Sequence, residues 1–292
     1  MEFHYNEFNY KRYGVNYLKI TTLIENEAGC NKELKNEFGL SLFIEDKDIS
    51  LIFDTGKSGD FIFNAQKLHI PLNEIKHVVL SHSHFDHTGG IKKLSDHFNN
   101  SFTLHIAKTF FEEKHRITGV IHEFLGNNFN EKYILDKGIK INYIENNEFK
   151  LSKNITLFTN FKSLNNFEVP TRYYFRKIYD NYILDNMEDE LVLGIDTSKG
   201  LLIVCGCSHI GIANIVENIK CRTQKKIYGI IGGLHLSKAS DERIEKVLNY
   251  FDECNIEFFG VSHCTGEKVT KILKESKKNF IYNNTGNTIT ID

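Results

Sequence analysis

The sequence predicts an α/β protein in which two mixed β-sheets pack together with helices on the outside. Two observations predict this fold class. Each end of the chain carries a block in which a hairpin is followed by alternating strands and helices, and no linker rich in Pro, Gly or Ser separates the blocks. We therefore expect a single domain over residues 1–292, with a candidate lid insertion at about 109–190, the least regular portion.

The first block is defined by changes in hydrophobic periodicity. Apolar residues alternate in its strands, whereas the helix after Ser58, a candidate N-cap, has apolar residues at helical spacing. The polar turn EDKD lies inside the hairpin. In chain order we predict a strand, a hairpin, a helix, a strand, an amphipathic helix and a strand over residues 19–26, 40–56, 58–68, 74–81, 88–98 and 102–108.

The second block begins with another hairpin, whose turn is DTSKG, over residues 190–209. Helical and strand patterns then alternate, which is typical of parallel strands joined by helices. A last hairpin is expected over 279–292, around Asn284 to Gly286. Between the two hairpins we predict a helix, a strand, a helix, a strand and a helix over residues 212–221, 226–233, 241–255, 257–263 and 266–276.

The composition is that of an ordinary globular protein, with 41% apolar and 25% charged residues. The net charge is −2, with 36 basic and 38 acidic side chains mixed along the chain, so no basic stripe favours nucleic acid. The apolar runs are far shorter than the roughly 20 residues of a membrane span. The polar N-terminal stretch lacks the core of a signal peptide. We expect a cytoplasmic protein with a small-molecule substrate, without nucleic-acid or membrane partners; nothing indicates its oligomeric state.

The segment SHSHFDHTGG, residues 81–90, gathers three histidines and an aspartate directly after an apolar run. His82 and His84 are two residues apart, so they point to the same side of an extended segment. Asp86 and His87 begin the following turn, where the chain can swing back toward the same point. Imidazole and carboxylate at this spacing suit Zn²⁺ or a related cation. A loop of solvated histidines is the alternative.

Further candidate ligands follow other apolar strands, where ligand-binding groups collect in α/β sheets. His209 ends the strand LLIVCGCSH and His263 ends FFGVSH. His235 follows a third strand beside Gly232 and Gly233; it is a candidate ligand, substrate contact or proton donor, with a structural histidine as the alternative. The six cysteines form no CxxC pair, which argues against a zinc knuckle or a thioredoxin-type site.

SHSHFDHTGG resembles the HxHxDH signature of the metallo-β-lactamase superfamily, whose fold is an αββα sandwich with a one- or two-metal site. FDTG upstream and His263 downstream fit its order and spacing, and the resemblance extends from about Thr21 to Asp292. The segments GCSH, GGLHL and SHCTG, with NFE near Asn166, resemble a narrower group. That group comprises the proteins similar to dihydropterin-ribofuranosylaminobenzene-phosphate synthase.

The resemblance implies a ligand set drawn from both halves of the chain. His82, His84 and His209 would hold one metal, and Asp86, His87 and His263 a second. Asp54 would accept a hydrogen bond from a ligating histidine and fix its tautomer, or else it is a turn residue before Gly56. We expect one or two divalent ions, Zn²⁺ first, with Mn²⁺ or Fe as alternatives.

One position departs from the superfamily pattern. Many members place a bridging aspartate after a strand of the second half, where this chain has Cys207 after Gly206. The Cys207 thiolate is a candidate ligand, and simple packing is the alternative. Five further positions are candidate substrate contacts. Ser208, Thr265 and Gly266 lie where the N-termini of helices could face an anion, and Arg172 and Arg176 could grip a phosphate, with a solvated loop as the alternative for the arginines.

These features predict a metal-dependent hydrolase that uses a metal-activated water on a small phosphorylated ester or diphosphate. Asp86 would orient or deprotonate that water, and His235 would stabilise developing charge. A metal-assisted group transferase of the synthase type is the alternative, in which the metal assists a leaving group. A second alternative is a non-catalytic metal-binding scaffold on the same fold.

Overall fold

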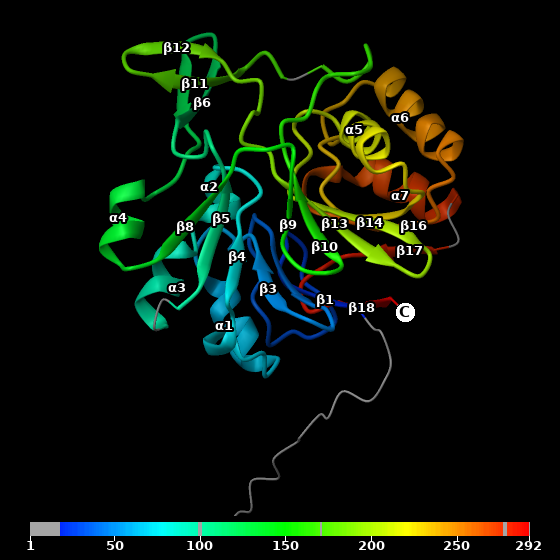
Figure 1. Ribbon diagram of the computed structural model, residues 1–292. Helices are drawn as coiled ribbons and strands as arrows, with labels where there is room; N and C mark the ends of the chain where they lie inside the picture. Colours follow the sequence, from blue (N-terminus) through cyan, green and yellow to red (C-terminus); the bar gives the residue numbers. More distant parts are fainter. Residues whose placement is uncertain (1–17, 99–100, 170, 277–278, 292) are drawn as a thin grey trace, which may run out of the picture.

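Two seven-stranded mixed sheets form the centre of the computed structural model, which describes residues 18–98, 101–169, 171–276 and 279–291 (Figure 1). The polar N-terminal stretch considered above lies outside the described residues. The sheets pack on each other, and helices cover their outer faces, so the predicted fold class is confirmed. In the described part of the chain, no helix is both long enough and apolar enough to span a membrane.

The first sheet combines the predicted first block with the end of the chain. Its strands β1, β2 and β3 are antiparallel, and β3, β4, β5 and β8 are parallel. In spatial order the sheet contains β18 (Thr288–Ile291), β1 (Leu18–Ile24), β2 (Ser41–Glu45), β3 (Ser50–Phe53), β4 (His77–Val79), β5 (Thr103–Ala107) and β8 (Lys140–Ile144). Its helices are α1 (Asp60–Lys67), α2 (Phe85–Thr88), α3 (Ile91–His97) and α4 (Glu131–Asp136), with a 3₁₀ turn at Leu72–Glu74.

The second sheet repeats this arrangement, with parallel strands on one side and antiparallel strands on the other. In spatial order it contains β17 (Asn279–Tyr282), β16 (Phe258–Val261), β15 (Ile227–Gly232), β14 (Gly200–Cys205), β13 (Val192–Thr197), β10 (Ile155–Phe158) and β9 (Glu148–Lys150). Its helices are α5 (Ile212–Thr223), α6 (Asp241–Glu253) and α7 (Glu267–Ser276), with a 3₁₀ turn at His263–Thr265.

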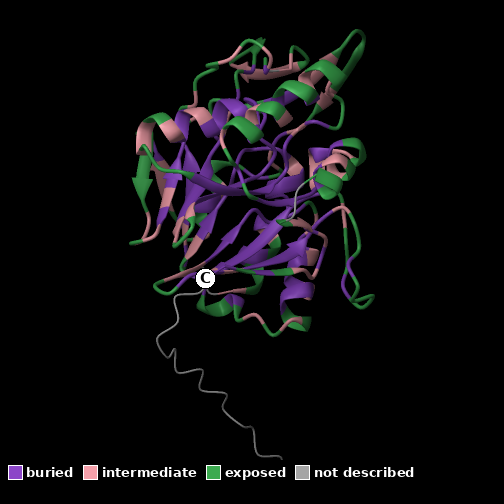
Figure 2. Ribbon diagram, turned by 90° about the vertical axis from the view of Figure 1, so that its right-hand side faces the viewer, coloured by how far each residue is buried: buried purple, intermediate pink, exposed green. Residues whose placement is uncertain are grey.

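The core has three layers because each sheet is apolar on both faces. One cluster, which includes Leu42 and Val204, fills the space between the sheets. A second lies between the second sheet and α5, α6 and α7, and a third between the first sheet and its helices. Figure 2 shows the strands as the buried centre and the outer faces of the helices as exposed. Burial on both faces explains why these strands have nearly continuous apolar sequences.

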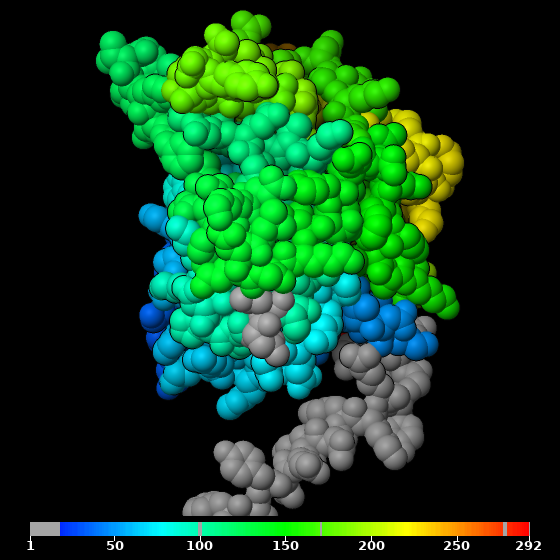
Figure 3. All heavy atoms as spheres, turned by 60° about the vertical axis from the view of Figure 1, so that its left-hand side comes forward, coloured from blue at the N-terminus to red at the C-terminus, as the bar shows by residue number. Residues whose placement is uncertain are grey.

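A separate four-stranded sheet lies above the two main sheets. We call it the roof sheet; it contains β12 (Asn181–Leu184), β11 (Tyr174–Ile178), β6 (Glu113–Thr118) and β7 (Ile121–Phe124). Figure 3 shows β11 and β12 at the top of the molecule, above the green segment that carries α4, β8 and β9. Residues 109–190, the segment predicted to be the least regular and a candidate lid insertion, include the roof sheet. They contain α4 and seven strands, of which β8, β9 and β10 complete the main sheets.

Two local predictions need correction. Residues 279–292 do not form a hairpin: β17 pairs with β16 in the second sheet, and β18 pairs with β1 in the first. Each strand completes a sheet edge and buries apolar side chains there, such as Ile289 between the sheets, which outweighs the local turn signal. Helix α1 begins after Gly59 rather than Ser58, although the Ser58 hydroxyl accepts a hydrogen bond from the Asp60 N–H at 3.3 Å. The other predicted strands and helices are present.

Candidate metal centre

The histidine-rich loop leaves the carboxyl end of β4 and ends at α3. His84 is extended, with φ −75° and ψ 143°, and precedes the single turn of α2 that carries Asp86 and His87. The two glycines that follow allow close packing. A Cβ at Gly89 would lie 2.0 Å from the Lys57 carbonyl oxygen, and one at Gly90 would lie 2.2 Å from that of Thr55. No side chain fits at either position, so the loop can lie flat against residues 55–57.

His82, His84 and His209 form a first group of candidate ligands, whose ligand atoms lie within 4.8 Å of one another. All three side chains are buried. Nε2 of His84 and both ring nitrogens of His209 have no hydrogen-bond partner among the described residues. Unpaired buried polar atoms are costly, and neutral imidazole nitrogens are ligands for Zn²⁺. The first group therefore fits a metal ion.

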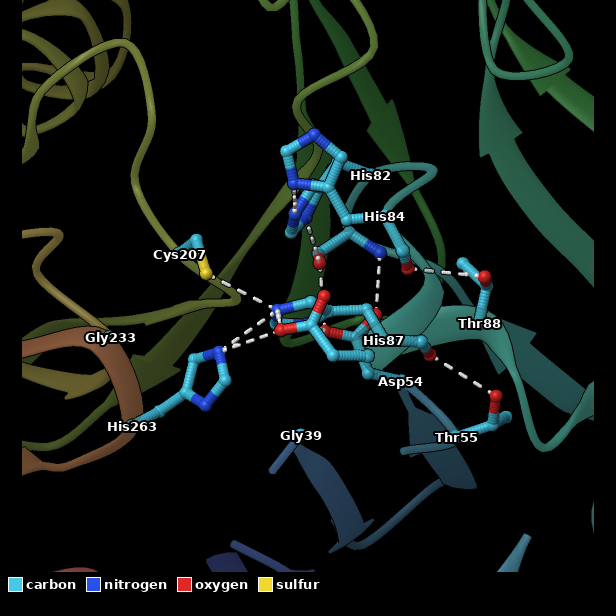
Figure 4. Close-up of polar contacts among 12 residues, drawn as sticks. Gly39, Asp54, Thr55, His82, His84, His87, Thr88, Cys207, Gly233 and His263 are labelled. Atoms are coloured by element: carbon cyan, nitrogen blue, oxygen red, sulfur yellow. Dashed lines mark hydrogen bonds and ion pairs between the residues drawn. The ribbon is translucent and has the colours of Figure 1, made fainter. Parts of the chain in front are cut away.

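Asp86, His87 and His263 form a second group, also within 4.8 Å of one another. His87 Nε2 lies 3.2 Å from His263 Nε2 (Figure 4). Asp86 Oδ2 lies 3.3 Å from the same nitrogen of His263. Burial alone would raise the pKa of Asp86, but His87 and His263 hold it below its usual range. Burial opposes the charge of His263, whereas the hydrogen bond to Asp86 raises its pKa to about 9. Three donor atoms thus face one another, as a second cation would require.

Asp54 contacts both ligand groups, one directly and one through Ser81. Its Oδ2 accepts a hydrogen bond from His87 Nδ1 at 2.7 Å, and its carboxylate also accepts from the N–H and the hydroxyl of Ser81, both at 2.7 Å. The Ser81 hydroxyl in turn lies 2.9 Å from Nδ1 of His82. A carboxylate on the outer nitrogen of a histidine fixes the tautomer in which the inner nitrogen can bind metal. Asp54 is placed to do this for His87, and through Ser81 it reaches His82.

A pocket of about 640 Å³ opens over these groups. Its floor includes His84, Asp86 and His209, and its wall includes Phe38. The roof sheet contributes Arg116 from β6, Glu123 and Phe124 from β7, and Tyr174 from β11, and Leu125 lies just beyond β7. The candidate metal ligands therefore face a cavity large enough for a small molecule.

Residues 34–131 match the family model of the metallo-β-lactamase superfamily. Over 285 residues the chain is 31% identical to the 7,8-dihydropterin-6-methyl-4-(β-D-ribofuranosyl)-aminobenzene-5'-phosphate synthase of Methanocaldococcus jannaschii, covering 91% of this chain and 94% of that protein. The chain belongs to the metallo-β-lactamase superfamily. The predicted resemblance to the superfamily and to the synthase-like group is confirmed.

Two further relatives cover nearly the whole chain. An uncharacterised protein of the same organism is 30% identical over 278 residues, covering 93% of this chain and all of that protein. The crystal structure of Tm1679, described as a metal-dependent hydrolase of the β-lactamase superfamily, superposes with a TM-score of 0.81 at 29% identity. It covers 93% of this chain and 98% of that one.

Cys207 lies between the two ligand groups of this superfamily member. Its Sγ is 3.2 Å from His87 Nε2 (Figure 4). Cys207 takes part in three of the five groups of candidate ligands found among the described residues. Its partners are His82 and His87 in one group, His209 and His235 in another, and His263 and Cys264 in the third. Burial raises the pKa of its thiol. A bound cation would favour the thiolate, so Cys207 can contribute to either group.

The remaining predicted residues lie at different distances from the pocket. The ring of His235 is 4.2 Å from that of His209 and lines the pocket. The Ser208 hydroxyl donates to the Gly233 carbonyl, and that of Thr265 donates to the Ser262 carbonyl, so both serve the local backbone. Gly266 precedes α7 and lines a different pocket. Two predicted arginines do not line the main pocket: Arg172, which is exposed, and Arg176, which pairs with Glu112 and Glu188.

Sequence analysis missed residues that come from short strands and loops. Arg116 and Glu123 face each other across the β6–β7 hairpin, where they form an ion pair. The alternation around Gly119 was the available signal for this hairpin. Glu190 accepts hydrogen bonds from the N–H groups of His209 and Ile210, both at 2.8 Å, and burial raises its pKa to about 8. No motif in the sequence pointed to this support of His209.

Proposed function

We propose that this chain is a metal-dependent hydrolase that acts on a small phosphorylated ester or diphosphate. The observation that carries the proposal is the pair of ligand groups, with unpartnered histidine nitrogens, beneath a pocket that contains Arg116. His82, His84 and His209 would hold one ion, and Asp86, His87 and His263 a second. Divalent cations in such sites polarise the scissile bond and lower the pKa of a coordinated water toward about 7.

The residues around the groups have distinct tasks in this proposal. Asp86 stays ionised, so its carboxylate can accept a hydrogen bond from the attacking water and orient it. His235 lines the pocket beside His209, and its Nδ1 has no partner among the described residues. It is therefore free to donate a proton or a hydrogen bond to charge that develops on the substrate. The roof sheet covers these groups and limits the access of bulk water.

The roof sheet suggests the substrate class. Arg116 is the arginine that lines the pocket, and Glu123 holds its Nε at 2.6 Å. A guanidinium oriented in this way suits a phosphate, because its fork of N–H donors matches phosphate oxygens. Phe38, Phe124 and Tyr174 offer aromatic surface nearby. A phosphorylated molecule with a flat apolar part fits this combination.

Group transfer is a second candidate, favoured by the synthase among the relatives. In that reaction an acceptor replaces water as the nucleophile, and the phosphate or diphosphate departs from the same position. The same pocket and ligand groups would serve both reactions. The two candidates differ in whether a second organic substrate is required.

The test is a panel of phosphate monoesters, phosphodiesters and diphosphates, incubated with metal-loaded protein in ¹⁸O-labelled water. Turnover without any acceptor, with one ¹⁸O in the product, is the expected result for a hydrolase. Turnover only with an added acceptor, and without ¹⁸O, would establish the transferase instead. Absence of turnover on the whole panel, with and without acceptors, would overturn the phosphorylated substrate class.

Arg116→Ala is expected to raise the KM for the phosphorylated substrate about tenfold or more, because a hydrogen bond to a charged group contributes about 1.5–3 kcal/mol. Steady-state kinetics measure this change. Arg176→Ala is the matched control: it lies on the neighbouring strand β11, and its guanidinium pairs with Glu112 and Glu188 outside the pocket. Equal KM values in the two variants would remove Arg116 from the binding site.

A further inference from the structure

A buried lysine of the roof sheet pairs with two aspartates in the segment between β12 and β13. Lys114 on β6 is 1% exposed, and its Nζ lies 2.9 Å from Asp185 Oδ2 and 2.8 Å from Asp189 Oδ1. Burial would lower the pKa of Lys114, but the two carboxylates raise it, so the side chain remains an ammonium ion. Taking such charges out of water is costly unless they are well paired. The pairing in this site is close on both sides of the lysine.

The second oxygen of Asp189 reaches the metal-binding loop. Asp189 Oδ2 accepts hydrogen bonds from the N–H of Ser83 at 2.9 Å and from its hydroxyl at 2.8 Å. Ser83 is the residue between His82 and His84, and both Ser83 and Asp189 are fully buried. A continuous chain of polar contacts therefore runs from Lys114 in the roof sheet to the backbone between two candidate ligands.

A second contact holds the other side of His84. The N–H of Phe85 donates to the Leu125 carbonyl at 2.8 Å, and the Leu125 N–H donates to the Lys114 carbonyl at 2.8 Å. The ring of Tyr174 on β11 also lies 5.5 Å from that of His84. Residues that adjoin the roof sheet, Asp189 and Leu125, thus contact the backbone on both sides of His84, and Lys114 on β6 takes part in both contacts.

We propose that Lys114 and Asp189 are positioning residues that fix Ser83, and through it the directions of His82 and His84, so that the first ligand group is preformed. In this arrangement the roof sheet is a fixed part of the metal centre and not a lid that swings open. The inference rests on the metal ligands of the proposed function, and it does not depend on the substrate.

Two matched substitutions test the inference. Asp189→Asn and Asp185→Asn each neutralise one carboxylate that pairs with Lys114, but only Asp189 touches Ser83. Affinity for Zn²⁺ is measured by competition with a chromophoric chelator, and thermal unfolding of the metal-free protein is followed in parallel. We expect Asp189→Asn to weaken Zn²⁺ binding about 10–100-fold, as loss of an outer partner does at other metal sites. Asp185→Asn should lower the unfolding temperature but keep the wild-type affinity.

Equal losses of affinity in the two variants would show a merely structural ion cluster, and wild-type affinity in Asp189→Asn would equally overturn the inference. Should Asp189→Asn fail to fold, Ser83→Ala provides the same test, because it removes only the hydroxyl contact. Its control is Ser95→Ala, a buried serine on α3 whose hydroxyl contacts Lys92 and Tyr133. Ser83→Ala should weaken Zn²⁺ binding and Ser95→Ala should not; equal affinities would refute the positioning role.

Failure of the proposed function would be recognised separately. Zinc affinity is measured without any substrate. If the variants show the predicted differences in zinc affinity but the wild-type protein turns over no phosphorylated compound, the positioning role is supported and only the substrate class is contradicted.

Discussion

The double variant His82→Ala, His84→Ala is expected to lose metal and catalytic turnover while keeping the fold. These residues supply two of the three donors of the first ligand group. Removing ligands should weaken metal binding more than loss of an outer partner does, which is about 10–100-fold. The Ser81 hydroxyl loses its contact with His82 but keeps its hydrogen bond to Asp54, so it is not left without a partner. Elemental analysis, turnover and circular dichroism measure the three outcomes.

The control for this variant is His77→Ala, His105→Ala. His77 Nδ1 lies 3.0 Å from His105 Nε2 within the first sheet, a contact like that between His82 and His84. Neither residue belongs to a ligand group found among the described residues. The control should retain full metal content. If the double variant at 82 and 84 kept wild-type metal and turnover, the proposed centre would be wrong.

Asp54→Asn should weaken metal binding about 10–100-fold, because the carboxylate orients His87. The amide would offer His87 Nδ1 either an N–H donor or a carbonyl oxygen, which is a weaker acceptor than a carboxylate. It would therefore no longer stabilise the tautomer in which His87 Nε2 is free to bind metal. The variant should also lower the free energy of unfolding by about 1–3 kcal/mol, since a fully buried group loses a charge-assisted hydrogen bond. Chelator competition and urea unfolding measure the two effects.

Asp46→Asn is the control for Asp54. Asp46 is also buried, but it lies in the turn of the β2–β3 hairpin and accepts hydrogen bonds from Asn154. We expect a change in stability without a change in metal affinity. Unchanged metal binding in Asp54→Asn would mean that His87 is oriented by the loop backbone alone.

Features that depend only on residues close together in the sequence were predicted from the sequence alone. The candidate ligands His82, His84, Asp86 and His87 lie within one short loop, and the turns of the two hairpins at residues 40–56 and 190–209 are encoded by their own residues. The same holds for α5, α6 and α7, whose apolar residues recur at helical spacing. Hydrophobic periodicity and turn chemistry are local properties, and for that reason they can be recognised without the fold.

The sequence placed His209 and His263 at the ends of apolar strands, where ligand-binding groups collect, and the family resemblance assigned each of them to an ion. Their approach to the loop is a property of the fold. It depends on the packing of the second sheet against the first, which brings the carboxyl ends of β14 and β16 to those of β4. No spacing in the sequence encodes that distance.

The tertiary structure alone decided how separated segments combine. The roof sheet joins β6 and β7 to β11 and β12 across about fifty residues, and this pairing places Arg116, not Arg172 or Arg176, in the pocket. It also allows Lys114 to reach Asp189. Likewise β17 and β18 pair with different sheets despite the hairpin signal between them. The choice of strand partner is set by the total surface buried at each sheet edge, a sum over residues distant in sequence, and so it is decided only when the chain folds.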